Sequence, residues 1–233
     1  MVNGKDMITA IIFDLDDTLY DEVEYCRSGF ISVSDLLADS IDGLSADRIF
    51  GALWKQFTSG NHTKTFNTAL DELGISYDDK LIGELIKAYR NHIPKITLSE
   101  ESENILSRLS DKYSLALLTD GFLPAQQLKV KALGIEKYFK YIIYTEQLGR
   151  EFWKPSPAGF EKLIDSLKAK PENIVYVADN EIKDFIAPNK LGIGTIQIIR
   201  NARIHTEQSQ ESNAAAQHVM HKISQLPELL EKL

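Results

Sequence analysis

The chain has 233 residues, of which 43% are hydrophobic and 26% charged, so it can build one sizeable core or a core with a smaller second domain. Acidic residues outnumber basic ones by 34 to 26, which gives a formal net charge of -8, and no basic stripe interleaved with aromatic residues occurs. This argues against nucleic acid as a partner. Cys26 is the only cysteine, which excludes an intrachain disulfide and favours a reducing, cytoplasmic location.

The first element predicted along the chain is a strand at residues 8–13. This run is apolar and largely β-branched, and the acidic segment Asp14-Leu15-Asp16-Asp17-Thr18 follows it directly. A buried parallel strand that delivers polar groups at its carboxyl end has this pattern. The run is too short to span a membrane and ends in carboxylates instead of a small-residue cleavage site. We therefore expect neither a membrane span nor a signal peptide in this part of the chain.

A helical segment is predicted between residues 20 and 94. The strand pattern disappears there, and apolar residues recur at helical spacing. They form three stretches: Val23, Phe30, Val33, Leu37 and Ile41; Ile49, Leu53 and Phe57; and Leu81, Leu85, Ile86 and Tyr89. We therefore expect two domains, an α/β core formed by residues 1–19 and 95–233 and a smaller α-helical domain formed by residues 20–94.

Strands and helices alternate in the rest of the chain. Four runs are similar to the first strand, at residues 114–119, 141–145, 174–178 and 195–199. Helices are predicted after Ser99 and at residues 124–133, 157–167 and 181–191. This alternation predicts a doubly wound, mostly parallel α/β sheet. The polar residues 201–217 predict a loop, which precedes a last short strand and a helix near residues 226–230.

Asp14 and Asp16 are the first candidates for chemistry. They lie two residues apart on an extended segment, so both carboxylates face the same side if the strand geometry persists. Such a pair repels a phosphate dianion unless a divalent cation is present, and hard oxygen ligands suit magnesium. A helix-capping or turn cluster is the other interpretation, because Asp-x-Asp-x-Thr also arises by chance. The position after a strand favours a binding site, because ligands of open α/β sheets bind beyond the carboxyl ends of strands.

Other strand ends also carry polar groups that can take part in chemistry. Hydroxyl and backbone amide groups there can hold anionic oxygens, and carboxylates can hold a cation. The candidates are Thr119, Asp120 and Gly121 after the second strand, Lys154 in a later loop, and Asp179 with Asp184 after the fourth strand.

These blocks, in this order, resemble the haloacid dehalogenase superfamily over nearly the whole chain. The motifs of that family match residues 14–19, then Thr119, then Lys154, and finally Asp179 with Asp184. The helical segment at residues 20–94 is similar to the cap that phosphatase-type members carry after the first motif. The resemblance therefore implies a Rossmann-like catalytic core with a helical cap.

Two positions depart from the common pattern of the family. Asp120 stands where an asparagine often follows the hydroxyl residue of the second motif, and Ala178 stands where glycine is frequent. Both departures weaken an assignment to a subfamily without changing the charged groups that match.

By this resemblance, Asp14 is the nucleophile that forms an aspartyl-phosphate, and Asp16 serves first as the acid and then as the base. Mg²⁺ is bound by the Asp14 carboxylate, the backbone carbonyl of Asp16 and Asp179. Asp184 orients the lysine of the third motif or a metal-bound water. The groups that hold the phosphoryl oxygens are Thr119, Asp120, Gly121 and Lys154.

The sequence thus predicts a Mg²⁺-dependent phosphohydrolase that acts on a small phosphorylated metabolite. Asp16 favours phosphate chemistry over dehalogenation, because the halide-releasing members of the family lack an aspartate there. A phosphomutase and a non-catalytic binding protein that keeps the fold are the alternatives. The substrate, the subfamily, the oligomeric state and the contacts between the cap and the substrate stay open.

Overall fold

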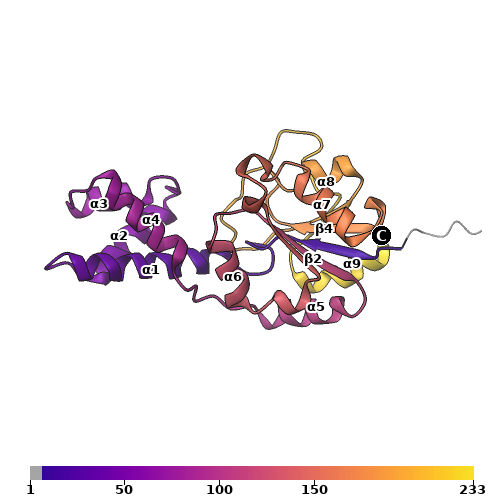
Figure 1. Cartoon of the computed structure of the whole chain (residues 1–233), viewed down its shortest axis with the longest axis horizontal. Coiled ribbons are helices and arrows are strands. Elements are labelled where there is room, and N and C mark those ends of the chain that lie inside the picture. Colours follow the sequence, from indigo (N-terminus) through magenta and orange to yellow (C-terminus); the bar gives the residue numbers. More distant parts are fainter. Residues whose placement is uncertain (1–6) are drawn as a thin grey trace, which may run out of the picture. The chain divides into compact units, whose positions relative to one another are not determined.

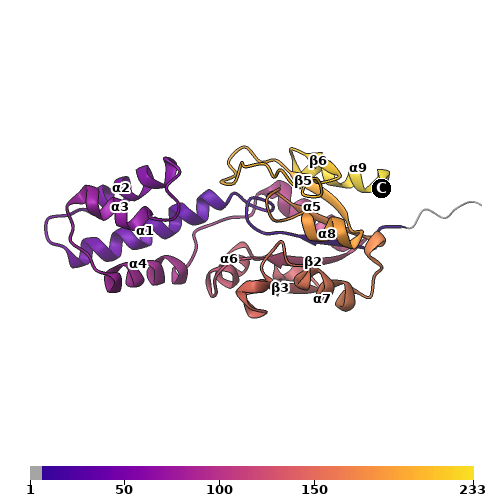
Figure 2. The same cartoon turned by 90° about the horizontal axis from the view of Figure 1, so that it is seen from above.

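A computed structural model describes residues 7–233 (Figure 1, Figure 2). Residues 1–6, which belong to the part where neither a signal peptide nor a membrane span is expected, lie outside the described residues. The chain forms two compact units. The first contains the chain up to Val23, Thr97–Phe122 and Leu133–Leu233, and the second contains Glu24–Ile96 and Leu123–Ala132. Between residues 7 and 233, no helix is long and apolar enough to cross a lipid bilayer.

The first unit is built on one sheet of six strands. They are β1 (Ala10–Phe13), β2 (Ser114–Thr119), β3 (Tyr141–Tyr144), β4 (Ile174–Ala178), β5 (Gly194–Ile198) and β6 (His218–Met220). Their order in space is β3-β2-β1-β4-β5-β6, and every pairing is parallel. The strand order changes direction at β1, so polar groups that follow β1, β2 and β4 gather at one edge. The predicted parallel α/β sheet is confirmed.

Helices cover both faces of this sheet, with α7 and α8 on one face and α5 and α9 on the other (Figure 1). Their bounds are α5 Glu100–Ser110, α7 Ala158–Leu167, α8 Ile186–Leu191 and α9 Leu226–Lys232. Single 3-10 turns lie at Glu136–Tyr138, Thr145–Gln147, Arg150–Phe152, Pro171–Asn173 and Ile223–Gln225. The fold is thus a three-layer α/β/α arrangement, in which the central strands β1, β2 and β4 are buried on both sides.

The core under α7 and α8 fixes how closely α7 approaches the sheet. Leu118 of β2 and Tyr176 of β4 pack there with Phe160 and Phe185. A Cβ atom at Gly159 in α7 would lie 2.6 Å from Cδ1 of Leu118, which is closer than such atoms can pack. Glycine therefore lets α7 rest directly on β2, and this contact anchors the loop that precedes α7.

The second unit contains helices at the three predicted stretches and a further helix, α3, which the periodicity did not predict (Figure 2). They are α1 (Glu22–Ser40), α2 (Ala46–Thr58), α3 (Thr65–Leu73) and α4 (Asp79–Asn91). Phe30 lies at the centre of their aromatic core. Its ring contacts four other rings with centroid separations of 5.3 to 6.5 Å, those of Trp54, Phe57, Phe66 and Tyr89.

The second unit also contains most of α6 (Ala125–Leu133), which follows β2 in the chain. The unit starts at Glu24 instead of residue 20, and the predicted insertion does not include α6. One contact that joins α6 to this unit lies between the Lys129 ammonium and the Tyr25 ring, whose centroid is 4.1 Å away. Helical periodicity predicts a helix at this position, but it does not predict which unit the helix packs against.

The helix predicted at residues 181–191 begins only at Ile186. The Asn180 side chain accepts a hydrogen bond from the backbone N–H of Ile182 at 3.0 Å, and the Asp184 carboxylate accepts one from the backbone N–H of Asn180 at 2.9 Å. Such side-chain bonds to the backbone compete with helical ones. They keep the segment after Asp179 in a turn and direct Asp184 back toward the end of β4.

Candidate active site

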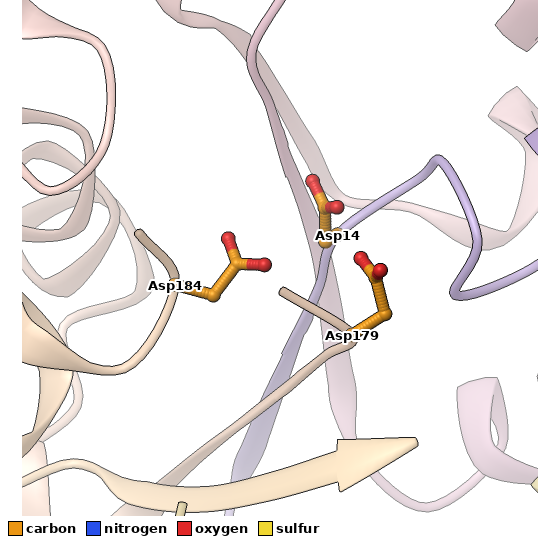
Figure 3. A group of neighbouring side chains, drawn as sticks. All are labelled: Asp14, Asp179 and Asp184. Atoms are coloured by element: carbon orange, nitrogen blue, oxygen red, sulfur yellow. The ribbon is translucent and has the colours of Figure 1, made fainter. Parts of the chain in front are cut away.

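Three buried carboxylates converge at the carboxyl edge of the sheet. Asp14 follows β1 and Asp179 follows β4, and these strands are neighbours. The strand pairing extends to Asp14, because its N–H donates to the carbonyl of Val177 at 2.9 Å. Asp184 comes from the turn after β4, and one oxygen from each of the three carboxylates lies within 4.8 Å of the other two. Figure 3 shows the three side chains at this edge.

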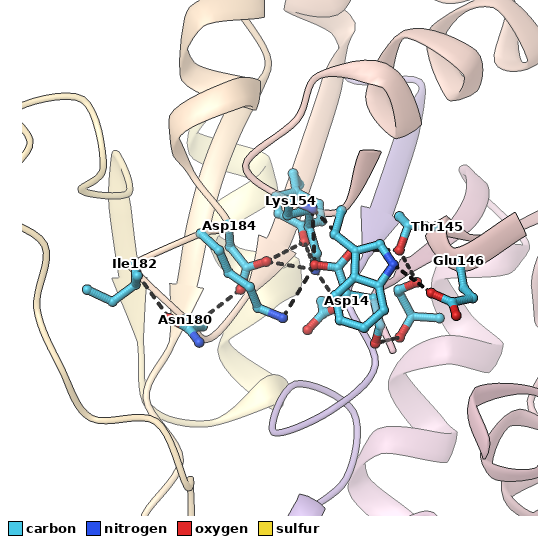
Figure 4. A network of polar contacts seen from close by, with 12 residues as sticks. Asp14, Thr145, Glu146, Lys154, Asn180, Ile182 and Asp184 are labelled. Atoms are coloured by element: carbon cyan, nitrogen blue, oxygen red, sulfur yellow. Dashed lines mark hydrogen bonds and ion pairs between the residues drawn. The ribbon is translucent and has the colours of Figure 1, made fainter. Parts of the chain in front are cut away.

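Lys154 brings one ammonium group to these carboxylates (Figure 4). Its Nζ lies 2.7 Å from Oδ1 of Asp14 and 2.7 Å from Oδ1 of Asp184, and it donates to the hydroxyl of Tyr176 at 3.0 Å. The Lys154 side chain is only 1% exposed. Three partners therefore fix the position of a fully buried charge.

Burial and neighbouring charges decide the protonation of these groups. Burial raises the pKa of Asp14 to about 6, although Lys154 opposes the change. Burial, together with the negative charges of Asp184 and Asp14, raises the pKa of Asp179 to about 9. Burial by itself lowers the pKa of Lys154, but the carboxylates of Asp14 and Asp184 outweigh it and raise that pKa well above its ordinary value. Burial raises the pKa of Asp184, but Lys154 and Lys183 outweigh it and lower that pKa.

The chemistry of these side chains fits a divalent cation. Oδ2 of Asp179 is buried and has no hydrogen-bond partner within residues 7–233, which costs free energy unless a proton or a cation compensates. Mg²⁺ binds oxygen ligands at about 2.0–2.1 Å, so two oxygens on opposite sides of one ion lie about 4.2 Å apart. One carboxylate oxygen of Asp14 and one of Asp179 lie within 4.8 Å of each other, which is close to this separation. Lys154 contacts Asp14 and Asp184 at the same distance, so Asp14 and Asp179 as the direct ligands stay a prediction from the sequence.

Thr119 is the last residue of β2, and Asp120 and Gly121 follow it; β2 pairs with β1 on the side opposite β4. The Asp120 carboxylate accepts hydrogen bonds from the backbone N–H of Lys154 at 3.3 and 3.2 Å, and from the Thr145 hydroxyl at 2.8 Å. Gly121 has a φ of 141°, a conformation that glycine adopts without strain. The Asp120 side chain therefore contacts the Lys154 loop, and phosphate binding at this turn stays a prediction for the backbone amides and for Thr119.

The Asp16 carboxylate lies outside the group formed by Asp14, Asp179 and Asp184. Its Oδ1 accepts a hydrogen bond from the Tyr20 hydroxyl at 2.5 Å. The next residue, Asp17, accepts hydrogen bonds from the backbone N–H groups of Glu22 at 2.8 Å and Ile204 at 2.7 Å. The turn after β1 is thus held by its own carboxylates, and the expected role of Asp16 stays a prediction.

Three residues that contact this site were not among the candidates from the sequence. Tyr176 donates from its hydroxyl to Asp184 at 3.1 Å, Lys183 places its Nζ 3.6 Å from Oδ2 of Asp120, and Thr145 binds the same carboxylate. A tyrosine in an otherwise apolar strand was the available signal for Tyr176, because a buried hydroxyl needs a partner. Lys183 lies between two candidate aspartates in the chain, but its partner follows a different strand.

Known proteins provide an independent comparison. The chain is 28% identical over 204 residues to the glyceraldehyde 3-phosphate phosphatase of Methanopyrus kandleri. The aligned segment covers 83% of this chain and 85% of that protein. It is 24% identical to human N-acylneuraminate-9-phosphatase, over 99% of this chain and 96% of the human protein. The structure is similar to that of the hydrolase YfnB from Bacillus subtilis, which was solved with magnesium, with a TM-score of 0.69 and 20% sequence identity. The superposition covers 96% of this chain and 99% of the YfnB chain. The model of the haloacid dehalogenase-like hydrolases matches residues 11–198, in agreement with the motifs in the sequence, and the chain belongs to this family.

Proposed function

We propose that this protein is a Mg²⁺-dependent phosphatase of small phosphorylated metabolites, with Asp14 as the nucleophile. The observation that carries the proposal is the contact of Lys154 with Asp14 and Asp184 beside the unpartnered carboxylate oxygen of Asp179. One ammonium group and a cation site next to a carboxylate nucleophile match the needs of phosphoryl transfer, in which positioning and charge stabilisation dominate.

The Asp14 carboxylate attacks phosphorus, and the bond between phosphorus and the leaving oxygen breaks as an aspartyl-phosphate forms. Lys154 keeps Asp14 ionised, because its positive charge opposes the effect of burial on the pKa of Asp14. Mg²⁺ held by the Asp14 carboxylate, Asp179 and the backbone carbonyl of Asp16 supplies positive charge that offsets the carboxylates and the phosphate.

Asp16 protonates the leaving oxygen and then takes a proton from the water that attacks phosphorus, which releases phosphate and restores Asp14. The hydrogen bond from Tyr20 supports this role, because it orients the Asp16 carboxylate. Thr119 and Lys154 bind the phosphoryl oxygens, together with the backbone amides of the turn after β2.

Two relatives support a small phosphorylated substrate, because they are named glyceraldehyde 3-phosphate phosphatase and N-acylneuraminate-9-phosphatase. The helices between residues 20 and 94 form the cap that selects this substrate. Cys26 is the only cysteine of the sequence and is buried, which supports a reducing, cytoplasmic compartment.

The test is release of free phosphate from a panel of phosphorylated metabolites, including glyceraldehyde 3-phosphate, with and without Mg²⁺. Asp14→Asn should lower kcat by at least about 1,000-fold, because an amide is a poor nucleophile. Asp165→Asn, which changes an exposed carboxylate on α7, is the control and should retain activity. Wild-type turnover by Asp14→Asn would exclude the covalent route, and absence of phosphate release from every compound would refute the phosphatase.

A further inference from the structure

We propose that Asp120 and Lys183 form a charge-matched pair that positions Lys154, the lysine of the phosphoryl site. The inference rests on the proposed function and adds two positioning residues to it. Asp120 stands where the family often has a neutral asparagine, and the ammonium group of Lys183 lies beside this additional carboxylate.

Asp120 holds the main chain of Lys154. Its carboxylate is 4% exposed, and both of its oxygens lie within hydrogen-bonding distance of the Lys154 backbone N–H, at 3.3 and 3.2 Å. Thr145 fixes the same carboxylate through a bond of 2.8 Å. Because the Lys154 ammonium contacts Asp14 at the other end of the same residue, movement of this backbone moves the charge that faces the nucleophile.

Lys183 connects the turn after β4 to the end of β2. It lies in the turn between Asp179 and Asp184, after β4, and its Nζ is 3.6 Å from Oδ2 of Asp120, after β2. The pair therefore links the two strands that flank β1, which carries Asp14. The Lys183 side chain is 31% exposed, compared with 1% for Lys154.

The negative and positive charges around Lys154 and Lys183 nearly balance once a divalent cation is included. Four carboxylates lie around the ammonium groups of Lys154 and Lys183, those of Asp14, Asp120, Asp179 and Asp184, and the turn after β1 carries two more, those of Asp16 and Asp17. For the four carboxylates and two ammonium groups alone, one divalent cation brings the sum of charges to zero when all four carboxylates are ionised. Loss of Lys183 leaves one negative charge in excess, which opposes a phosphate dianion. Asparagine at position 120 removes one negative charge and keeps a carbonyl oxygen for the Lys154 N–H.

If the two charges are matched, removal of both should restore the phosphate affinity that removal of Lys183 alone lowers. An ordinary surface ion pair gives no such rescue. Lys183→Met should raise the KM for the phosphorylated substrate and the inhibition constant of inorganic phosphate by about tenfold, the effect expected of one unbalanced charge near the site. The double variant Asp120→Asn with Lys183→Met has the same net charge as the wild type, and it should recover most of this loss. Asp120→Ala should lower kcat more than it raises KM, because it removes the acceptor that holds Lys154.

The control is Lys170→Met, which removes an exposed lysine paired with Glu172 at 3.8 Å. Lys170 precedes β4 and therefore lies toward the opposite end of the strands from the site. Circular dichroism of each variant tests folding, and calorimetric titration with inorganic phosphate in the presence of Mg²⁺ measures binding without turnover.

The inference is overturned if Lys183→Met leaves the KM and the phosphate affinity unchanged, or if the double variant is no better than Lys183→Met. In either case, turnover by the wild type leaves the proposed function intact. If the wild type binds phosphate but releases none from any compound, the phosphatase is refuted and the binding constants alone decide the positioning pair. If the wild type neither binds nor releases phosphate, both proposals are wrong.

Discussion

At the scale of single residues, Tyr176 shows how a core position takes part in the site. Its ring packs in the core under α7 and α8, 4.8 Å from the ring of Phe160, and its hydroxyl connects Lys154 to Asp184. Burial, followed by the charge of Asp184, raises the pKa of Tyr176 well above its ordinary value. The hydroxyl therefore keeps its proton and can accept from Lys154 while it donates to Asp184.

Tyr176→Phe removes this hydroxyl with little change of volume. We expect the free energy of unfolding to fall by about 1 kcal/mol, the typical contribution of one hydrogen bond, and kcat to fall about tenfold because Lys154 loses one of three partners. Thermal denaturation and steady-state kinetics measure the two effects. Tyr141→Phe, on the outermost strand β3, is the control, and an equal loss of kcat in both variants would contradict the role of the Tyr176 hydroxyl.

At the scale of elements, the packing of α7 on β2 fixes the loop that carries Lys154. The helix begins at Ala158, and the close contact between Gly159 and Leu118 sets its distance from the sheet. The N-terminus of α5 is fixed in a similar way: Ser99 accepts a hydrogen bond from the N–H of Ser102, whose hydroxyl donates to the carbonyl of Leu19 at 3.0 Å. Helix positions therefore control both the Lys154 loop and the turn that follows Asp14.

Gly159→Ala places a methyl group against the buried Leu118 side chain. We expect it to destabilise the protein by about 1–3 kcal/mol through overpacking, despite the higher helix propensity of alanine. Gly83→Ala in α4 is the matched control, because nothing lies within 4 Å of a Cβ there, and it should be neutral or stabilising by up to about 1 kcal/mol. Denaturant unfolding measures both, and equal stability of the two variants would contradict the close contact.

At the scale of the whole molecule, buried acids couple stability to pH and to metal. The pKa of Asp14 is raised to about 6 and that of Asp179 to about 9, so the folded, metal-free protein binds more protons than the unfolded chain. The sign follows from linkage: as the pH rises from the unfolded pKa near 3.8 through these folded values, the free energy of unfolding decreases. A divalent cation bound at Asp179, as we propose, would replace the proton of this carboxyl, so the affinity for the cation should increase with pH.

We therefore expect the Tm of the metal-free protein to decrease between pH 6 and pH 8.5. Addition of Mg²⁺ should raise the Tm more at pH 8.5 than at pH 6, because more of the Asp179 carboxylate is ionised. Asp179→Asn should abolish most of the Mg²⁺ effect. Differential scanning calorimetry, with NaCl at the same ionic strength as the control, measures these shifts, and a Mg²⁺ effect independent of pH would contradict the assignment.

Local patterns in the sequence determined the strands, most of the helices and the family motifs. Apolar runs that end in carboxylates define β1 and β4, and helical spacing defines α1, α2 and α4, because burial and periodicity are properties of neighbouring residues. The same locality limits what patterns reveal. The helix after residue 181 is shorter than its periodicity predicts, because the side chains of Asn180 and Asp184 bind the backbone instead.

Contacts between distant residues were decided only by the tertiary structure. Strand order brings Lys154 to Asp14 and Lys183 to Asp120, and it places Tyr176 between Lys154 and Asp184. The physical reason is that a charge pair depends on which strands are neighbours and on how far each side chain reaches, and neither is a property of a local segment. The acidic motifs thus identify the kind of chemistry, and the folded chain decides which cation meets which carboxylate.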